Sequence, residues 1–167
     1  MPVSEHDFKL GMRRLGGAVT IVTTAHNGVQ GGLTATAVTS LSAQPPRLLA
    51  CINRQGGSYG LVSNGRVMAV NVLAERHQAL AECFAGLDDT PESDRFRKGA
   101  WRTGALGVPV LSDALVAFEC RVESILDVGS HGVVIGSIEA VTAPEKGGAP
   151  LCYMDGGWAH MVPRRGD

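Results

Sequence analysis

The chain has 167 residues, the length of one ordinary domain, and 44% of them are hydrophobic, which is enough for a substantial core. The formal net charge of −1 gives no support for a nucleic-acid partner or a membrane-surface partner. No apolar run approaches the roughly 18 residues of a membrane span, and the charged N-terminus lacks the apolar core of a secretory leader, so we expect a cytoplasmic protein.

The first part of the chain predicts a helix followed by a β-hairpin. Ser4 is a suitable N-cap for a helix over residues 4–15. The β-branched run 18–24 predicts a strand, and residues 30–38 predict the strand that returns. Between them, Asn27-Gly28 suits a type I′ turn, so the two strands form a hairpin.

The middle of the chain alternates strands and short helices. Pro45-Pro46 breaks the chain before an apolar strand over residues 47–52. Residues 58–64 predict one or two helical turns, and the apolar run 67–73 predicts a buried strand. Residues 75–85 form the clearest helix after the first one, with apolar side chains at helical spacing.

The last part of the chain begins with a polar loop over residues 87–104, which includes one short helix and is of a length that is often functional or mobile. Residues 114–124 alternate apolar and polar side chains, which predicts a strand. Two further strands are predicted over residues 131–143 and 151–153.

These elements amount to seven or eight strands with turns between them, which favours a mostly antiparallel β-barrel with helical caps. The sequence lacks the βαβ rhythm, the GxGxxG motif and the P-loop of the common nucleotide-binding folds. A bound nucleotide would therefore not be held in the Rossmann manner.

The four cysteines lie among apolar neighbours, at Cys51, Cys83, Cys120 and Cys152. None of them forms a CxxC pair, and their spacing does not suit metal ligation. We therefore expect buried, reduced thiols and no metal site.

The stretch from Gly31 to Ser58 is the strongest candidate for a binding site. It begins with small residues and hydroxyls as far as Ser42 and, after the two prolines, opens from a strand into the polar loop 53–58. Small side chains let a flat ligand lie against the backbone, and hydroxyls, free amides and one arginine suit a phosphate. Considered alone, the stretch indicates a phosphate or a flat ligand nearby.

Six stretches of the chain match the motifs of a known family, in the family's order, and together span about residues 7–161. They are DFKLGMRRLGGAVTIVTT, GGLTATAVTSLSAQPPRLLACINRQGGS, VMAVNVLAERHQALAECFAG, RFRKGAWRTGALGVPVLSDALVAFECRV, VGSHGVVIGSIEAV and PLCYMDGGWAHM. In these stretches the chain resembles the short flavin reductases, the NAD(P)H:flavin oxidoreductases of two-component flavin monooxygenases. The resemblance implies a mostly β, split β-barrel flavin-binding fold with short capping helices. It also implies a single flavin reductase-like domain over residues 1–167 and a homodimer with flavin near the subunit interface.

The resemblance also implies a site for FMN or FAD. The residues expected to border the isoalloxazine ring, through backbone groups, are Thr34, Ala35, Thr36 and Ala37. Those expected along the ribityl chain and phosphate are Ser40, Asn53, Arg54 and Ser58. The polar loop is expected to complete the pocket with Arg95 and Phe96, and the nicotinamide of NADH or NADPH is expected beside His131 and Tyr153. Ser130 stands where aspartate is common in the family.

The chemistry implied is hydride transfer from the nicotinamide C4 to the flavin N5, after which the reduced flavin diffuses to a partner flavin-dependent oxygenase. Because the two cofactors carry this reaction, no catalytic side chain is expected. One alternative is a non-catalytic flavin-binding protein or electron carrier of the same fold. Another is a small β-barrel that binds a non-flavin ligand. The choice between FMN and FAD, the choice between NADH and NADPH, and the partner's identity stay open.

Overall fold

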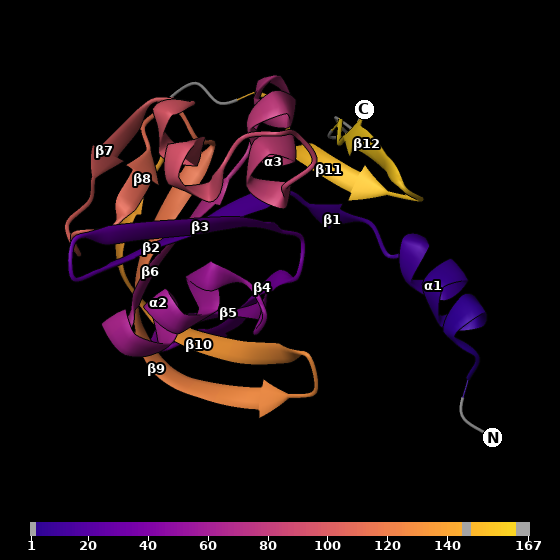
Figure 1. Cartoon of the computed structure of the whole chain (residues 1–167), viewed down its shortest axis with the longest axis horizontal. Helices are drawn as coiled ribbons and strands as arrows, with labels where there is room; N and C mark the ends of the chain where they lie inside the picture. The colour runs from indigo at the N-terminus through magenta and orange to yellow at the C-terminus, as the bar shows by residue number, and fades with distance from the viewer. Residues whose placement is uncertain (1–2, 145–147, 163–167) are drawn as a thin grey trace.

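The computed structural model describes residues 3–144 and 148–162, so the two ends of the predicted domain, 1–167, lie outside the described residues (Figure 1). Its largest element is a seven-stranded antiparallel sheet. In spatial order the strands are β3 (Val29–Ala35), β2 (Thr20–His26), β6 (Val67–Val72), β9 (Val116–Val128), β10 (His131–Thr142), β5 (Pro46–Asn53) and β4 (Val38–Ala43).

Smaller elements surround this sheet. A three-stranded sheet consists of β1 (Gly17–Ala18), β11 (Leu151–Met154) and β12 (Gly157–His160), and a separate hairpin consists of β7 (Trp101–Thr103) and β8 (Pro109–Leu111). The α-helices are α1 (Glu5–Arg13), α2 (Gly57–Gly65) and α3 (Gln78–Ala85), and the short 3₁₀ helices are η1 (Glu75–His77) and η2 (Glu92–Arg97). Among the described helices, none combines the length and the apolar content needed to cross a bilayer.

The large sheet curls so that its first and last strands approach each other (Figure 1). β3 and β4 follow each other in the chain but lie at opposite edges, and the Cys51 N–H of β5 donates to the Ala37 carbonyl at 2.9 Å. The predicted fold class, mostly β with a split-barrel architecture and short capping helices, is confirmed. The single strand predicted over residues 30–38 is wrong. β3 ends at Ala35 and β4 starts at Val38, because the two segments pair with different strands.

Local sequence signals explain several boundaries. The Ser4 hydroxyl accepts the Asp7 N–H at 3.1 Å and so caps α1, as predicted. Asn27 and Gly28 both have positive φ, 50° and 79°, which is the backbone of the predicted type I′ hairpin between β2 and β3. Gly86 ends α3 with a φ of 71°.

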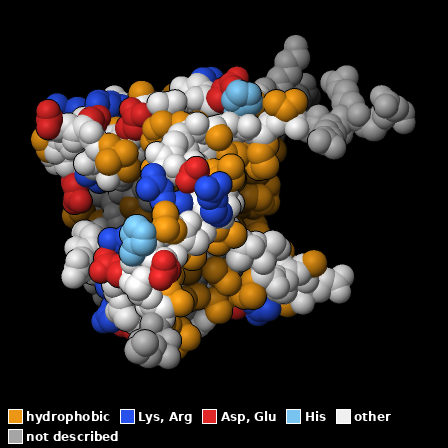
Figure 2. All heavy atoms as spheres, turned by 90° about the vertical axis from the view of Figure 1, so that its right-hand side faces the viewer, with side chains coloured by type: hydrophobic (Ala, Val, Ile, Leu, Met, Phe, Trp, Pro, Cys, Tyr) orange, Lys and Arg blue, Asp and Glu red, His pale blue; other side chains and the backbone are white. Residues whose placement is uncertain are grey.

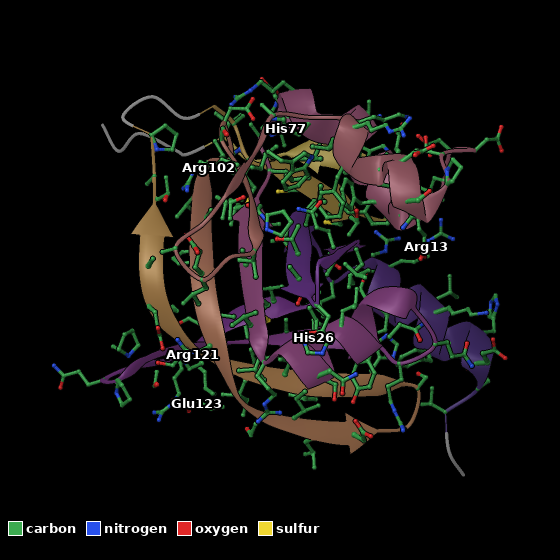
Figure 3. All side chains as sticks on the ribbon, turned by 60° about the vertical axis from the view of Figure 1, so that its left-hand side comes forward. Arg13, His26, His77, Arg102, Arg121 and Glu123 are labelled. Atoms are coloured by element: carbon green, nitrogen blue, oxygen red, sulfur yellow. The ribbon has the colours of Figure 1, made fainter. Side chains whose placement is uncertain are left out.

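Ion pairs link strands of the large sheet, and one buried histidine fastens η1. Arg121 of β9 pairs with Glu139 at 2.9 Å, and Glu123 pairs with Arg47 of β5 at 2.6 Å (Figure 3). His77 is buried, accepts the Ala74 N–H at its Nδ1 and lies 3.0 Å from an Asp113 carboxylate oxygen through its Nε2. His77 thus holds η1 against the segment that follows β8.

The cysteines are free thiols, and Cys83, Cys120 and Cys152 are buried, whereas Cys51 is half-buried. Burial, reinforced by the charge of neighbouring Glu119, raises the pKa of the Cys120 thiol to about 12. This thiol is therefore protonated at neutral pH and behaves as a small core residue. The described residues contain no group of three or more His, Cys, Asp or Glu side chains arranged to hold a metal ion.

Candidate functional site

A cavity of about 380 Å³ lies between β3, the start of α2 and η2. It brings together three of the residues predicted to bind flavin, Ser58, Arg95 and Phe96, although they are up to 38 positions apart in sequence. Other lining residues used below are Gly31, Gly32, Gly57 and Glu92. We call this space the phosphate cavity, because an arginine and a helix N-terminus, both suited to an anion, lie at its wall.

Arg95 supplies a buried positive charge to the phosphate cavity. Its side chain is only 14% exposed, and its Nε atom is buried with no hydrogen-bond partner among the described residues. The carboxylate of Glu92 lies 3.8 Å from an Arg95 nitrogen and forms a loose ion pair with it. A buried guanidinium N–H without a partner is costly, so an anion that accepts from it would be bound favourably.

The N-terminus of α2 supplies the second positive element. Gly56 occupies the N-cap position and offers no side chain to the first turn. The first N–H groups of an α-helix have no partner within the helix and carry the positive end of the helix dipole. Because Gly57 and Ser58 line the cavity, this helix terminus and one hydroxyl face the same space as Arg95.

The loop that carries Arg95 is held in place at both ends. Lys98 donates to the Asp88 carboxylate at 2.8 Å, and the Thr90 N–H donates to the same side chain at 3.0 Å. The Lys98 hydrogen bond, followed by that from Thr90, lowers the pKa of Asp88 to about 2. Phe96 packs edge-on against Phe84 and Trp101, with ring centroids 5.1 and 5.2 Å away, so it belongs to an aromatic cluster as well as to the cavity wall.

Gly31 and Gly32 are required by the protein's own packing, which differs from the expectation that small residues leave room for a flat ligand. A Cβ on Gly31 would lie 2.6 Å from a Leu61 methyl and 3.2 Å from the Ser58 hydroxyl. A Cβ on Gly32 would lie 2.6 Å from the Phe84 ring. These glycines therefore let α2 and the aromatic cluster approach β3.

The far end of β3 leads to a second and a third cavity. Thr34, Ala35 and Thr36 line a cavity of about 240 Å³ together with Tyr153 and Trp158. The Thr34 hydroxyl donates to the Ala81 carbonyl at 2.7 Å, so this side chain fastens β3 to α3. Along β3 the nearest lining residues of the two cavities, Gly32 and Thr34, are two positions apart, which is about 7 Å in an extended strand.

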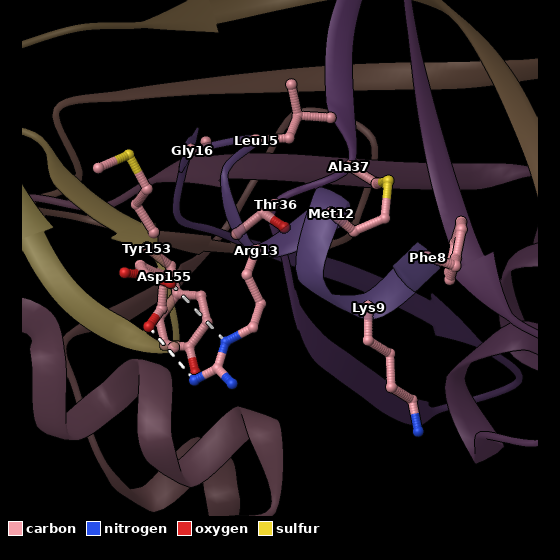
Figure 4. Close-up of a pocket in the computed structure, with 13 residues that line it drawn as sticks. Phe8, Lys9, Met12, Arg13, Leu15, Gly16, Thr36, Ala37, Tyr153 and Asp155 are labelled. Carbon is pink, nitrogen blue, oxygen red and sulfur yellow. Dashed lines mark hydrogen bonds and ion pairs between the residues drawn. The ribbon is translucent and has the colours of Figure 1, made fainter. Parts of the chain in front are cut away.

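The third cavity, of about 640 Å³, lies beside α1 and includes Thr36, Ala37 and Tyr153 (Figure 4). Arg13 at the end of α1 donates to the Asp155 carbonyl at 3.3 Å, and the Asp155 N–H donates back to the Arg13 carbonyl at 2.7 Å. These bonds tie the helix to the β11–β12 turn. The Thr36–Ala37 corner is thus shared by two cavities and by the start of β4.

His131 is connected to the Thr36–Ala37 corner only through β5, about 12 Å away by strand geometry. It pairs with Asn53, two positions along from the Val133–Cys51 pair, and Cys51 is bonded to Ala37. His131 is exposed, and its Nδ1 lies 2.8 Å from the Ser130 hydroxyl. His131 itself lines none of the three cavities of this single chain.

Arg54 and Asn53 do not line the phosphate cavity. The Arg54 guanidinium lies 3.1 Å from the Asp127 carboxylate and donates to the Gly129 carbonyl at 3.2 Å, so it is engaged at the β9–β10 turn. The Asn53 side chain accepts the Gln55 N–H at 2.9 Å and shapes the loop before α2. Ser40, on edge strand β4, is exposed and lines none of the three cavities.

Tyr59 and Asp127 were not singled out by the sequence patterns. The Tyr59 hydroxyl donates to the Asp127 carboxylate, which raises the pKa of Tyr59. The Tyr59 ring also lies so close over Gly132 that no side chain would fit there. Together with Arg54, they hold the β9–β10 turn, and hence His131, against α2 and the loop before it. An isolated tyrosine in a short helix carried no signal for this role.

Known proteins resemble this chain over most of its length. Residues 12–161 match the model of the flavin reductase-like domain. The chain is 42% identical over 151 residues to the FMN reductase (NADH) RutF 1 of Methylorubrum extorquens, which covers 90% of this chain and 74% of that protein.

Two solved structures show the same fold. A flavin reductase domain protein from Arthrobacter sp. FB24 superposes with a TM-score of 0.88 and 32% identity, covering 98% of this chain and 99% of that one. Nitrilotriacetate monooxygenase component B from Mycobacterium thermoresistibile superposes with a TM-score of 0.85 and 28% identity, covering 98% and 92%.

Proposed function

We propose that this chain, which belongs to the flavin reductase-like family and is a flavin reductase, reduces FMN with NADH by hydride transfer to the flavin N5. The observation that carries the choice of a phosphorylated flavin is Arg95, which lines the cavity together with the first turn of α2 and whose buried Nε has no hydrogen-bond partner among the described residues. The FMN reductase (NADH) named among the relatives supports FMN and NADH as the first pair to test. FAD and NADPH are the alternatives.

The proposed binding mode follows β3 from end to end. Arg95, Ser58 and the first turn of α2 would hold the flavin phosphate, with Phe96 forming the cavity wall. The backbone of Thr34, Ala35, Thr36 and Ala37 would border the isoalloxazine at the second and third cavities. A phosphate and a ring at opposite ends of one strand suit an extended ligand.

The protein's part in the reaction is to bind and orient. Bound flavin supplies the hydride acceptor at N5, and the nicotinamide C4 is the donor. Tyr153 lines the third cavity beside the Thr36–Ala37 corner. His131, on the strand next to β5, would join Tyr153 in positioning the nicotinamide over the flavin ring. Because the cofactors carry the chemistry, no side chain is assigned a catalytic role. We propose no direct contact with the flavin for Ser40, Asn53 and Arg54, only that they lie close to it. Arg54 would act indirectly, by holding the β9–β10 turn.

The surface around α1 supports a homodimer. α1 has no buried residue, and Phe8, Met12 and Leu15 are 58%, 48% and 70% exposed. Hydrophobic side chains gather on the face that carries this helix (Figure 2). Exposed apolar surface of this kind marks an interface, and a second copy would cover the third cavity and the Thr36–Ala37 corner. Light scattering that gave the mass of one chain would refute the dimer.

We also propose that the reduced flavin leaves the site for a partner oxygenase. The support is the structural neighbour that is component B of a monooxygenase. A cytoplasmic location stays a prediction, as does a single domain over the whole chain. The alternative of a non-catalytic flavin carrier differs in one respect, because such a protein would bind flavin without oxidising NADH.

The test of the proposed function is a matrix of rates. NADH and NADPH oxidation are measured with FMN, FAD and riboflavin in turn, and with no flavin added. We expect oxidation that depends on added flavin and is fastest with NADH and FMN. Flavin binding without oxidation of either nicotinamide would favour the carrier, and no change in flavin fluorescence on mixing would favour a non-flavin ligand.

Replacing His131 with alanine is expected to raise the Michaelis constant for NADH about fivefold to tenfold, with the Michaelis constant for FMN unchanged. The reason is the loss of one polar contact to the nicotinamide, worth about 1 kcal/mol. His160→Ala is the matched control, because His160 lies in β12, where its ring nitrogen is 3.8 Å from the Glu75 carboxylate. It is expected to leave the Michaelis constant for NADH unchanged. Equal Michaelis constants for NADH in wild type and His131→Ala would remove His131 from the site.

A further inference from the structure

Among the described residues that line the phosphate cavity, Glu92 is the only acidic one. Its Oε2 lies 3.1 Å from the position that a Cβ on Gly57 would take, which places the carboxylate at the first turn of α2. Its Oε1 lies 3.8 Å from Arg95 Nη1. The carboxylate therefore stands between the two positive elements of the cavity, the helix N-terminus and the Arg95 guanidinium.

These are the same two elements to which the proposed function assigns the flavin phosphate. A carboxylate and a phosphate carry like charges, and at a separation of about 4 Å their repulsion is substantial even in water. The Glu92 side chain is 70% exposed, so solvent is open to it and it has room to rotate away. An incoming phosphate must displace this internal anion before it reaches Arg95 and α2.

We propose that Glu92 competes with the flavin phosphate for Arg95 and the N-terminus of α2, and so sets the affinity of this reductase for phosphorylated flavins. The inference rests on the proposed function, because it assumes that a flavin phosphate enters this cavity. It makes Glu92 a specificity-determining residue that narrows the preference for FMN over riboflavin, which has no phosphate. It would also ease the proposed release of reduced flavin, because the Glu92 carboxylate can take the place of the departing phosphate beside Arg95.

The test is Glu92→Gln, which removes the charge and keeps the size of the side chain. We expect the dissociation constant and the Michaelis constant for FMN to fall about fivefold to tenfold, since one unit charge at about 4 Å in water changes a binding constant by about fivefold and the phosphate carries up to two. The constants for riboflavin are expected to stay within twofold of wild type. Flavin fluorescence titration and initial rates of NADH oxidation measure both.

Asp94→Asn is the matched control. Asp94 lies in the same 3₁₀ helix and pairs with Arg97 at 3.4 Å across the same i,i+3 spacing, so Asp94→Asn removes one negative charge just as Glu92→Gln does. Asp94 does not line the phosphate cavity. It is expected to leave both flavins unaffected. Salt screens exposed charges. The difference in the FMN dissociation constant between Glu92→Gln and wild type is therefore expected to shrink as NaCl is raised from about 0.05 to about 0.5 M, which lowers the Debye length from above about 10 Å to below about 5 Å.

The outcomes separate this inference from the function it rests on. If wild type oxidises NADH with FMN and Glu92→Gln leaves the FMN constants unchanged, or shifts those of riboflavin equally, the competition is refuted. If Asp94→Asn tightens FMN as much as Glu92→Gln does, net charge alone explains the effect and the assignment to Glu92 fails. If wild type shows no flavin-dependent oxidation at all, the proposed function itself fails.

Discussion

Replacing Arg95 with methionine is expected to raise the Michaelis constant for FMN about 30-fold to 100-fold and to change that for riboflavin by less than threefold. The guanidinium is largely buried, and its Nε has no partner within the described chain, so it is poised for an anion. A hydrogen bond to a charged group is worth about 1.5–3 kcal/mol, and the phosphate would accept more than one from this side chain. Methionine keeps most of the apolar stem, which limits the loss of packing.

Two companion variants make this prediction specific. Arg97→Met changes the same residue type in the same 3₁₀ helix, but the Arg97 side chain is 81% exposed, and no effect on either flavin is expected. Ser58→Ala is expected to weaken FMN about fivefold, which is the loss of one neutral hydrogen bond, and to spare riboflavin. Equal losses for FMN and riboflavin in Arg95→Met would show that Arg95 supports the loop and does not contact a phosphate.

Replacing Asn71 with alanine is expected to lower the free energy of unfolding by about 3–4 kcal/mol. Asn71 is fully buried in β6, where its amide donates to the Ile21 carbonyl at 3.0 Å and to the Thr23 hydroxyl at 3.3 Å. Its carbonyl oxygen accepts the Leu111 N–H at 2.8 Å. Alanine would leave buried polar groups unsatisfied and a cavity behind, and both effects are costly.

Asn71 also fastens β8 to the large sheet, since Leu111 belongs to β8 and packs in the same core cluster as Phe84. Chemical denaturation of both proteins measures the difference. Asn64→Ala, at an exposed position in α2, is the control and is expected to change stability by less than about 0.5 kcal/mol. A loss below 1 kcal/mol in Asn71→Ala would mean that water replaces the three hydrogen bonds.

Signals that act over a few residues were sufficient to predict many parts of this fold. The Ser4 cap, the Asn27-Gly28 hairpin and the end of α3 at Gly86 all follow from neighbouring residues, and each is confirmed by the backbone. The fold class and the family also followed from the sequence, because the six motifs occur in order and the matched domain covers residues 12–161.

The composition of the site was predicted in part. Ser58, Arg95 and Phe96 were expected near a flavin, and the structure brings them to one cavity. Arg54 was expected beside the phosphate, yet its charge is engaged by Asp127, which lies 73 positions further along the chain. An arginine in a glycine-rich loop has the same local pattern whether a ligand or a distant carboxylate is its partner.

Tertiary structure alone decided the remaining features, because each depends on residues that are distant in sequence. The break at Thr36–Ala37 exists because β3 pairs with β2 and β4 pairs with β5 at the opposite edge of a curled sheet. The Arg95 nitrogen that has no partner among residues 3–144 and 148–162, and the position of Glu92, both depend on how η2 packs against α2. Local propensity describes what each segment prefers, whereas long-range pairing and burial determine which charges meet and which are left without a partner.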